Sequence, residues 1–213
     1  MSRIRYLAVI LMLMIMLALA GCTKTWSVKF NQFTNLDAWA QQDWFPPSTF
    51  NLYPDGLSLN GKILIGPYGF DGDFTFTCAF ETSCGIGYTI PLIHLFFSDG
   101  GYAAPGQYLS INLNDVGDPS GESYSITATG AASLVVGGSI PFINRIGLNT
   151  IVLVKTGNHY EITLNGNPIL DQFITTLGFD YFFPYLYAVT EDNLQIRFKS
   201  ISYKYDGNRM SRP

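Results

Sequence analysis

Charged side chains are scarce in this chain: Asp, Glu, Lys and Arg make up 13% of its 213 residues, about half the usual share. This scarcity disfavours exposed helices, which depend on many Lys–Glu pairs. The 12 basic residues form no stripe along the chain, and the formal net charge is −4. These features argue against nucleic acid as a partner and against electrostatic binding to anionic lipids.

Histidine and cysteine are also few, with two and three residues respectively. No His, Asp and Glu residues stand at a zinc spacing, no EF-hand loop is present, and no glycine-rich loop precedes a helix. We expect His94, inside an apolar segment, to be half-buried, and His159, beside a turn, to be solvated. One histidine alone does not support a catalytic triad, so we predict no catalytic and no metal-binding residue.

Apolar residues are abundant at the start of the chain. Arg3 and Arg5 precede an unbroken apolar segment, 7–20, which is followed by Gly21 and Cys22. This order is typical of a secretory signal peptide, and the segment is short for a bilayer, which takes about 20 helical residues to cross. The small residues before the cysteine resemble the lipobox of bacterial lipoproteins. That resemblance implies cleavage before Cys22 and lipid attachment to it.

Removal of residues 1–21 as a lipoprotein signal peptide takes away two of the 12 basic residues and none of the 16 acidic ones, which leaves a net charge of −6. The resemblance implies three acyl chains, and two already anchor a protein stably. In such lipoproteins an acidic residue directly after the cysteine retains the protein at the inner membrane. Here that position holds Thr23, which favours the outer membrane. We expect a lipid-anchored protein of the cell envelope, with 22–29 as a lipidated tether. An uncleaved transmembrane anchor and an unlipidated signal peptide are the alternatives.

Cys78 and Cys84 are the cysteines that remain after Cys22. In an oxidising envelope compartment two nearby cysteines usually pair, and we predict a disulfide between them. Closure of so short a loop would contribute about 2–3 kcal/mol. Two reduced cysteines, one of them buried, are the alternative.

Period-two alternation of apolar residues predicts strands along most of the chain. Aromatic residues reach 15%, and such side chains pack well on a pleated sheet. The clearest strand is 73–81, in which Phe74, Phe76 and Phe80 share one face with Cys78. The other predicted strands are 49–53, 57–59, 62–65, 86–97, 107–114, 123–127, 133–136, 150–155, 159–165 and 194–203. One short helix is predicted at 36–42, opened by Asn35.

About a dozen short strands between turn residues predict an all-β domain over 30–205, a two-sheet antiparallel sandwich or jelly roll, with 206–213 as a flexible tail. Residues 181–187 hold too many rings for every one to be buried. Four segments, by their order, resemble the concanavalin A-like lectin/glucanase family with its laminin G-like jelly rolls: 55–59, 70–76, 155–166 and 194–201. This fold hosts both enzymes and binding proteins.

The resemblance implies a groove strand at 107–114, where glycan-acting relatives carry acids. Here the residues that alternate with leucine and isoleucine are Tyr108, Ser110, Asn112 and Asn114. Tyrosine offers a sugar a flat apolar face and a hydroxyl, and asparagine offers both a donor and an acceptor. We therefore predict non-catalytic binding of a polysaccharide or glycan on a concave sheet face, with Tyr102 and His94 as further candidates. An ordinary solvated strand face is the alternative.

A divergent glycoside hydrolase on the same fold is a second hypothesis. Retaining glycosidases need two carboxylates about 5 Å apart, but the chain has no Glu-x-Asp-x-Glu pattern. The acids would have to come from different strands, for example from Glu122, Glu161 or Asp115. A third hypothesis is a structural envelope protein that binds a protein partner.

The resemblance leaves one exception to the predicted absence of metal open, a structural calcium ion, since some relatives hold one in their loops. The candidate ligands are Asp71, Asp73 and Asp99. Asp71 and Asp73 stand in a turn, which by itself explains why aspartate occurs there.

Overall fold

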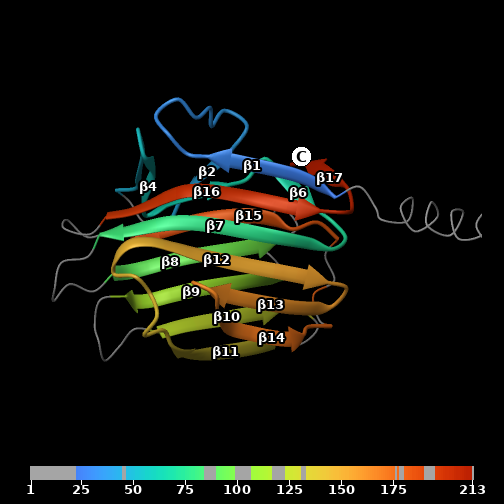
Figure 1. The fold of residues 1–213 in the computed structure, drawn as a ribbon. Coiled ribbons are helices and arrows are strands. Elements are labelled where there is room, and N and C mark those ends of the chain that lie inside the picture. Colours follow the sequence, from blue (N-terminus) through green and yellow to red (C-terminus); the bar gives the residue numbers. More distant parts are fainter. Residues whose placement is uncertain are drawn as a thin grey trace, which may run out of the picture.

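The computed structural model describes residues 23–44, 47–83, 90–98, 107–116, 123–130, 133–175, 177, 180–189 and 195–212. Two large antiparallel sheets and one small sheet account for all the regular structure in these ranges, which contain no helix (Figure 1). Hence no helix in these ranges is long and apolar enough to cross a membrane. The predicted all-β class is confirmed.

The first large sheet has eight strands. Its order is β14 (Asn167–Phe173), β13 (His159–Leu164), β12 (Ile146–Thr156), β7 (Phe74–Ser83), β16 (Gln195–Tyr205), β4 (Gly56–Asn60) and β3 (Thr49–Tyr53), and β1 (Lys24–Lys29) also pairs with β16.

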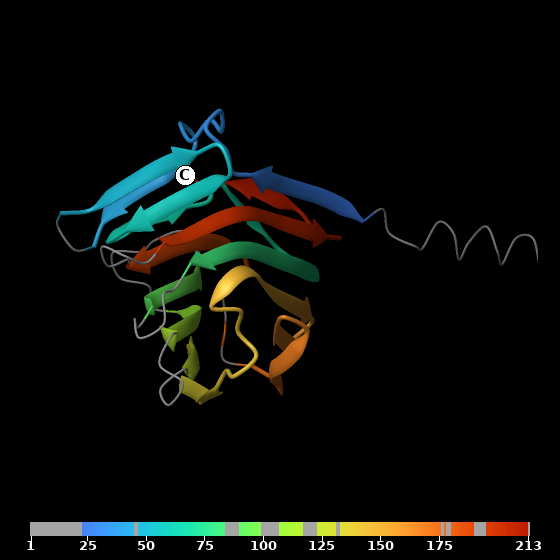
Figure 2. The ribbon, with the colours of Figure 1, turned by 60° about the vertical axis from the view of Figure 1, so that its left-hand side comes forward.

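The second large sheet has seven strands. Its order is β11 (Ser133–Ser139), β10 (Ser123–Thr129), β9 (Tyr108–Val116), β8 (Ile90–Ser98), β15 (Phe183–Val189), β5 (Lys62–Ile65) and β2 (Ala40–Asp43). The small sheet pairs β6 (Tyr68–Phe70) with β17 (Arg209–Ser211). Figure 2 shows β8 to β11 on one side of the sandwich and β12 to β14 on the other.

The core lies between the two large sheets, and β7 shows how alternation builds it. Phe74, Phe76, Cys78 and Phe80 are each at most 3% exposed, as predicted. The Phe76 ring meets Phe97 of β8 edge-on at 5.0 Å, so side chains of the two sheets interdigitate. The intervening threonines and alanine of β7 lie on the outer face of the eight-stranded sheet.

The predicted limits of the domain are too narrow at both ends. Residues 24–29, expected in a tether, form β1 and pair with β16 from Lys24↔Tyr205 to Lys29↔Ser200. Residues 209–211, expected in a flexible tail, form β17 against β6. Strand β17 has only exposed side chains, so it lacks the alternation by which a half-buried strand is recognised. Strand β1 does alternate, with Trp26 and Val28 half-buried between exposed residues, but over only six residues.

The short helix predicted at 36–42 is wrong. The side-chain oxygen of Asn35 accepts the N–H of Asp37 at 2.7 Å, and Trp39 N–H donates to Leu36 O at 2.9 Å. The asparagine therefore closes a turn and caps no helix, since such local side-chain bonds compete with helix formation. Strand β2 begins directly after this turn, at Ala40.

The predicted disulfide is also wrong. Cys78 is fully buried with a free thiol, and burial raises the pKa of that thiol. Cys84 lies outside the described residues.

Candidate functional site

The candidate site is the outer face of the seven-stranded sheet, and strand β9 presents the predicted residues on it. Leu109, Ile111 and Leu113 are fully buried between the sheets. Successive side chains of a strand point to opposite faces, so the alternate set lies on the outer face. That set is Tyr108, Ser110, Asn112 and Asn114.

The strand register joins His94 of β8 and Asn112 of β9 in one row across the sheet. Asn112 stands opposite His94 on one side and opposite Ser125 of β10 on the other. Its amide donates to the Ser125 hydroxyl at 3.3 Å. Tyr187 of β15 extends the row beyond His94, with the two rings edge to face at 6.3 Å. The structure therefore brings two predicted residues together with two that sequence reasoning missed.

Aromatic rings flank this row. Tyr108 stacks on Phe96 with ring centroids 5.0 Å apart, so its ring has a fixed orientation. Phe96 in turn meets Tyr185 edge-on at 5.1 Å. Ser110 is only 3% exposed, and its strand partner is Phe96, which leaves it less open to a ligand than Asn112. Trp44, 46% exposed, meets Tyr187 at 6.4 Å and adds a ring that was not among the predicted site residues.

One half of this outer face is an apolar cluster of its own. Its buried members are Ile63, Ile65, Phe96, Phe183, Tyr185 and Tyr187. Every residue of β15 from Phe183 to Ala188 is buried, but Tyr181 just before it is only partly buried, so the prediction that not every ring of 181–187 is buried is confirmed. When both faces of a strand are covered, its sequence is a continuous apolar run without alternation. The outer face thus divides into an apolar half and a polar half, and the His94–Asn112 row lies between them.

Two buried polar atoms in this row have no hydrogen-bond partner among the described residues: Nε2 of His94 and the hydroxyl of Tyr187. Burial lowers the pKa of His94 to about 4, so the imidazole is neutral at pH 7 and carries one donor and one acceptor. An unpaired buried polar atom costs about 1–3 kcal/mol, so such groups usually find a ligand or a water molecule. The row offers neutral donors and acceptors, which suit hydroxyl groups better than ions.

The remaining predicted site residues lie elsewhere. Tyr102, Asp99, Glu122 and Cys22 fall outside the described residues, as does the side chain of Asp115. Glu161 lies on the outer face of the other sheet.

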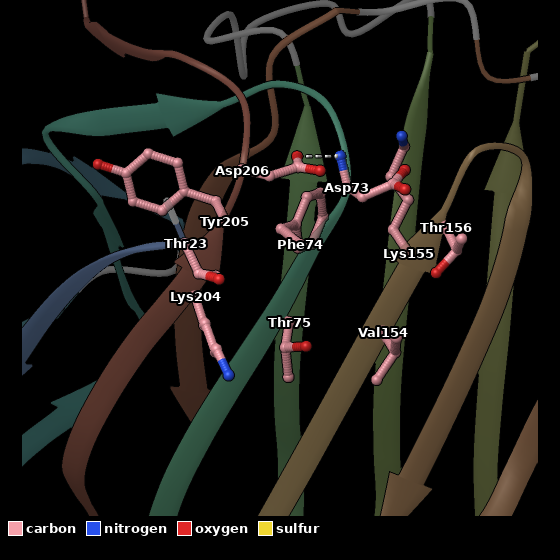
Figure 3. A pocket seen from close by; sticks show the side chains of 10 residues that line it. All are labelled: Thr23, Asp73, Phe74, Thr75, Val154, Lys155, Thr156, Lys204, Tyr205 and Asp206. Carbon is pink, nitrogen blue, oxygen red and sulfur yellow. Dashed lines mark hydrogen bonds between the residues drawn. The ribbon is translucent and has the colours of Figure 1, made fainter. Parts of the chain in front are cut away.

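Asp73 lines an open cavity of about 370 Å³ at one end of the sandwich (Figure 3). The cavity is formed by Thr23, Asp73, Phe74, Thr75, Val154, Lys155, Thr156, Lys204, Tyr205 and Asp206. The Asp206 carboxylate accepts the backbone N–H of Asp73 at 3.1 Å, and the Asp73 carboxylate accepts that of Gly157 at 2.6 Å.

Three of the four carboxylate oxygens of Asp71 and Asp73, two of the expected calcium ligands, accept hydrogen bonds. Both carboxylate oxygens of Asp71 accept hydrogen bonds from Asn208. The Lys155 ammonium donates to Gly72 O at 2.9 Å and so brings a positive charge to this turn. Burial lowers the pKa of Lys155, whereas the carboxylates of Asp73 and Asp206 act in the opposite direction. Hydrogen-bond donors thus compete with a calcium ion for these oxygens, and Asp99 lies outside the described residues, so the calcium ion stays a prediction.

The sequence matches no protein-family model and no curated protein. The solved structures that share the fold include the following three. The exoplasmic/lumenal domain of VIP36, in its Ca²⁺/Man3GlcNAc-bound form, has a TM-score of 0.57 at 12% identity and covers 83% of this chain and 86% of its own. The carbohydrate recognition domain of Emp46p has a TM-score of 0.64 at 13% identity, with 86% and 97% covered. A Bacillus subtilis protein of unknown function with a galectin-like fold has a TM-score of 0.61 at 10% identity, with 89% and 100% covered. This chain is therefore an all-β sandwich with the jelly-roll fold of lectin-like domains.

Proposed function

We propose that this protein binds neutral glycans without catalysis, through the outer face of the seven-stranded sheet. The observation that carries the proposal is the row of His94, Asn112 and Ser125, which is neutral, polar and flanked by tyrosine rings. Sugars are bound through hydroxyl groups that both donate and accept, and through C–H faces that stack on rings. VIP36 holds mannose-containing glycans on the same fold, which supports glycans as the ligand class.

Screening of neutral oligosaccharides, mannose-containing ones included, tests this proposal. We expect binding in the millimolar to micromolar range, and Asn112→Ala should weaken it about tenfold, since the lost hydrogen bonds are worth roughly 1–2 kcal/mol. Asn51→Ala is the matched control because Asn51 is exposed on β3 of the other sheet. Absence of any binding at millimolar concentration, or equal losses in the two variants, would contradict the proposal.

Nothing in the described part of the site favours a glycoside hydrolase. Among the side chains described in β8, β9, β10 and β15, none is Asp or Glu. Glu161, one of the acids expected for such an enzyme, faces away on the other sheet. Two facing carboxylates are what glycoside hydrolysis requires, so the described outer face supports binding only.

We also propose that the chain is a lipid-anchored envelope protein with its lipid on Cys22. Strand β1 begins at Lys24, so Thr23 alone separates the lipidated residue from the first strand. Two residues span at most about 7 Å, which would hold the Thr23 end of the sandwich against the membrane surface. Substitution Cys22→Ser should move the protein from the membrane fraction to the soluble fraction and remove labelling by radioactive palmitate. A wild-type chain that stays soluble and unlabelled would contradict this anchor.

A further inference from the structure

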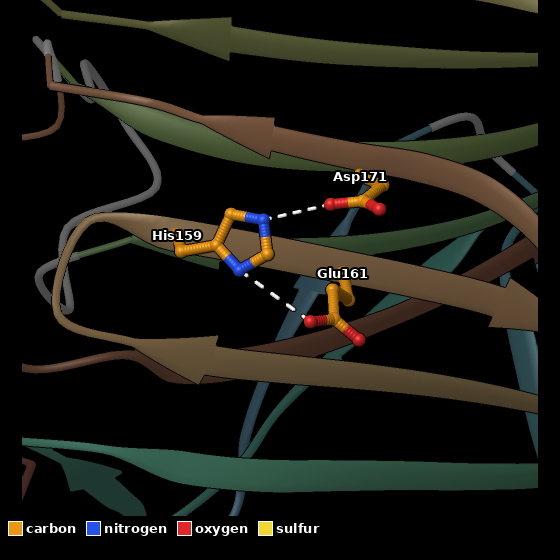
Figure 4. A group of neighbouring side chains, drawn as sticks. All are labelled: His159, Glu161 and Asp171. Atoms are coloured by element: carbon orange, nitrogen blue, oxygen red, sulfur yellow. Dashed lines mark hydrogen bonds and ion pairs between the residues drawn. The ribbon is translucent and has the colours of Figure 1, made fainter.

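Three ionisable side chains converge on the outer face of the eight-stranded sheet, opposite the proposed glycan site. His159 and Glu161 come from β13, and Asp171 comes from β14 (Figure 4). Nε2 of His159 lies 2.7 Å from an Asp171 carboxylate oxygen, and Nδ1 lies 3.4 Å from a Glu161 oxygen. We refer to these three residues as the β13–β14 triad.

The strand geometry explains why they meet. Tyr160 and Ile162 are buried between the sheets, so His159 and Glu161 both point outward. The register sets Glu161 directly opposite Asp171. Like charges directly opposite on neighbouring strands repel each other, so this pairing favours a cation between the two carboxylates.

The imidazole is held in place while the carboxylates remain open to water. The His159 ring lies 4.7 Å from the Phe173 ring, and the side chain of His159 is 26% exposed. The side chains of Glu161 and Asp171 are 53% and 71% exposed. An ion can therefore reach the triad from solvent without displacing any packed side chain.

The donor set selects the kind of ion. Each residue offers one ligand atom, and these three atoms lie within 4.8 Å of one another. One imidazole nitrogen and two carboxylate oxygens give three protein ligands, and water can take the fourth position. Calcium and magnesium prefer oxygen ligands throughout, whereas imidazole suits zinc and similar transition metals.

We propose that the β13–β14 triad binds one divalent transition-metal ion of the zinc type. The ion would link β13 to β14, which lies at the edge of its sheet. The site is separate from the glycan-binding face, and the proposal does not depend on glycan binding.

Calorimetric titration with Zn²⁺ of the purified full chain, without a polyhistidine tag, tests this proposal. We expect one Zn²⁺ per chain for the wild type, and a dissociation constant at least about tenfold higher in Asp171→Asn, Glu161→Gln and His159→Gln, since each variant removes a metal ligand. Glu81→Gln is the matched control, because Glu81 is also an acid on the outer face of this sheet but pairs with Lys199. The control should bind Zn²⁺ like the wild type.

Thermal unfolding with and without metal distinguishes a variant that has lost metal binding from one that has lost its fold. All variants should unfold cooperatively without metal, and Zn²⁺ should raise the Tm of the wild type and of Glu81→Gln only. Ca²⁺ should leave every Tm unchanged. Three outcomes would overturn the proposal: no Zn²⁺ binding by the wild type, equal binding by the triad variants, or a Tm rise with Ca²⁺ as large as with Zn²⁺.

Discussion

Replacement of Asn149 by alanine should lower the free energy of unfolding by about 3–4 kcal/mol, because several buried hydrogen-bonding groups lose their partners at about 1–3 kcal/mol each. Asn149 is completely buried in β12. Its amide oxygen accepts the N–H of Asn144 and the side-chain amide of Asn165, both at 2.8 Å. Its NH₂ group donates to Asn144 O at 2.8 Å and to the Thr82 hydroxyl at 3.1 Å.

This network joins β7, β12 and the turn after β13. The loss of stability in Asn149→Ala should therefore appear in the global unfolding transition. Urea denaturation followed by tryptophan fluorescence measures it. Asn51→Ala removes the same carboxamide from an exposed strand position and should change stability by less than about 0.5 kcal/mol. A loss below about 1 kcal/mol in Asn149→Ala would show that the network contributes little.

The stability of the wild-type protein should fall by up to about 3 kcal/mol as the pH is lowered from 6.5 to 4, through His94 alone. Burial lowers the pKa of His94 in the folded chain to about 4, compared with 6.5 as the ordinary value. Between these values the unfolded chain takes up a proton that the folded chain does not, so acid favours unfolding. Above pH 6.5 the imidazole is neutral in both states and its effect on stability no longer changes with pH.

Substitution His94→Gln should flatten the pH dependence between 4 and 6.5. The Asp55 carboxylate acts at lower pH: hydrogen bonds from Arg197 and Lys199 hold its pKa below 3.8, so the stability that these bonds contribute is lost only in stronger acid. Urea denaturation at pH 7, 5.5 and 4.5 measures the effect of His94, since all three values lie above the pKa of Asp55. An equal slope in wild type and His94→Gln would show that His94 is not the source.

Sequence alternation predicted the parts of the fold in which one face of a strand is buried and the other is open. Strand β7 is such a case, and β9 is another, which is why Asn112 and Asn114 could be placed on the outer face. Strand β15 was missed because both of its faces are covered, so apolar residues occupy consecutive positions. The edge strand β17 was missed for the opposite reason, since all its side chains are exposed, whereas β1 carries a short alternation of half-buried Trp26 and Val28 that sequence reasoning overlooked.

The candidate sites depend on strand register, which local sequence does not encode. His94 and Tyr187 are neighbours only because β15 lies beside β8, although the two residues are far apart in the chain. Likewise, the His159-x-Glu161 spacing is visible in the sequence, but Asp171 reaches it through a pairing whose register shifts between Ile162 and Thr163. Such shifts are tertiary features that no periodicity reveals.

NMR titration with the tightest-binding neutral oligosaccharide tests the central claim most directly, because it locates the ligand on the chain. The account predicts the largest chemical-shift changes in β8, β9 and β10, with the side-chain amide of Asn112 among them. Changes centred on the outer face of the eight-stranded sheet would contradict it, as would a glycan that leaves the Asn112 signals unmoved at saturation.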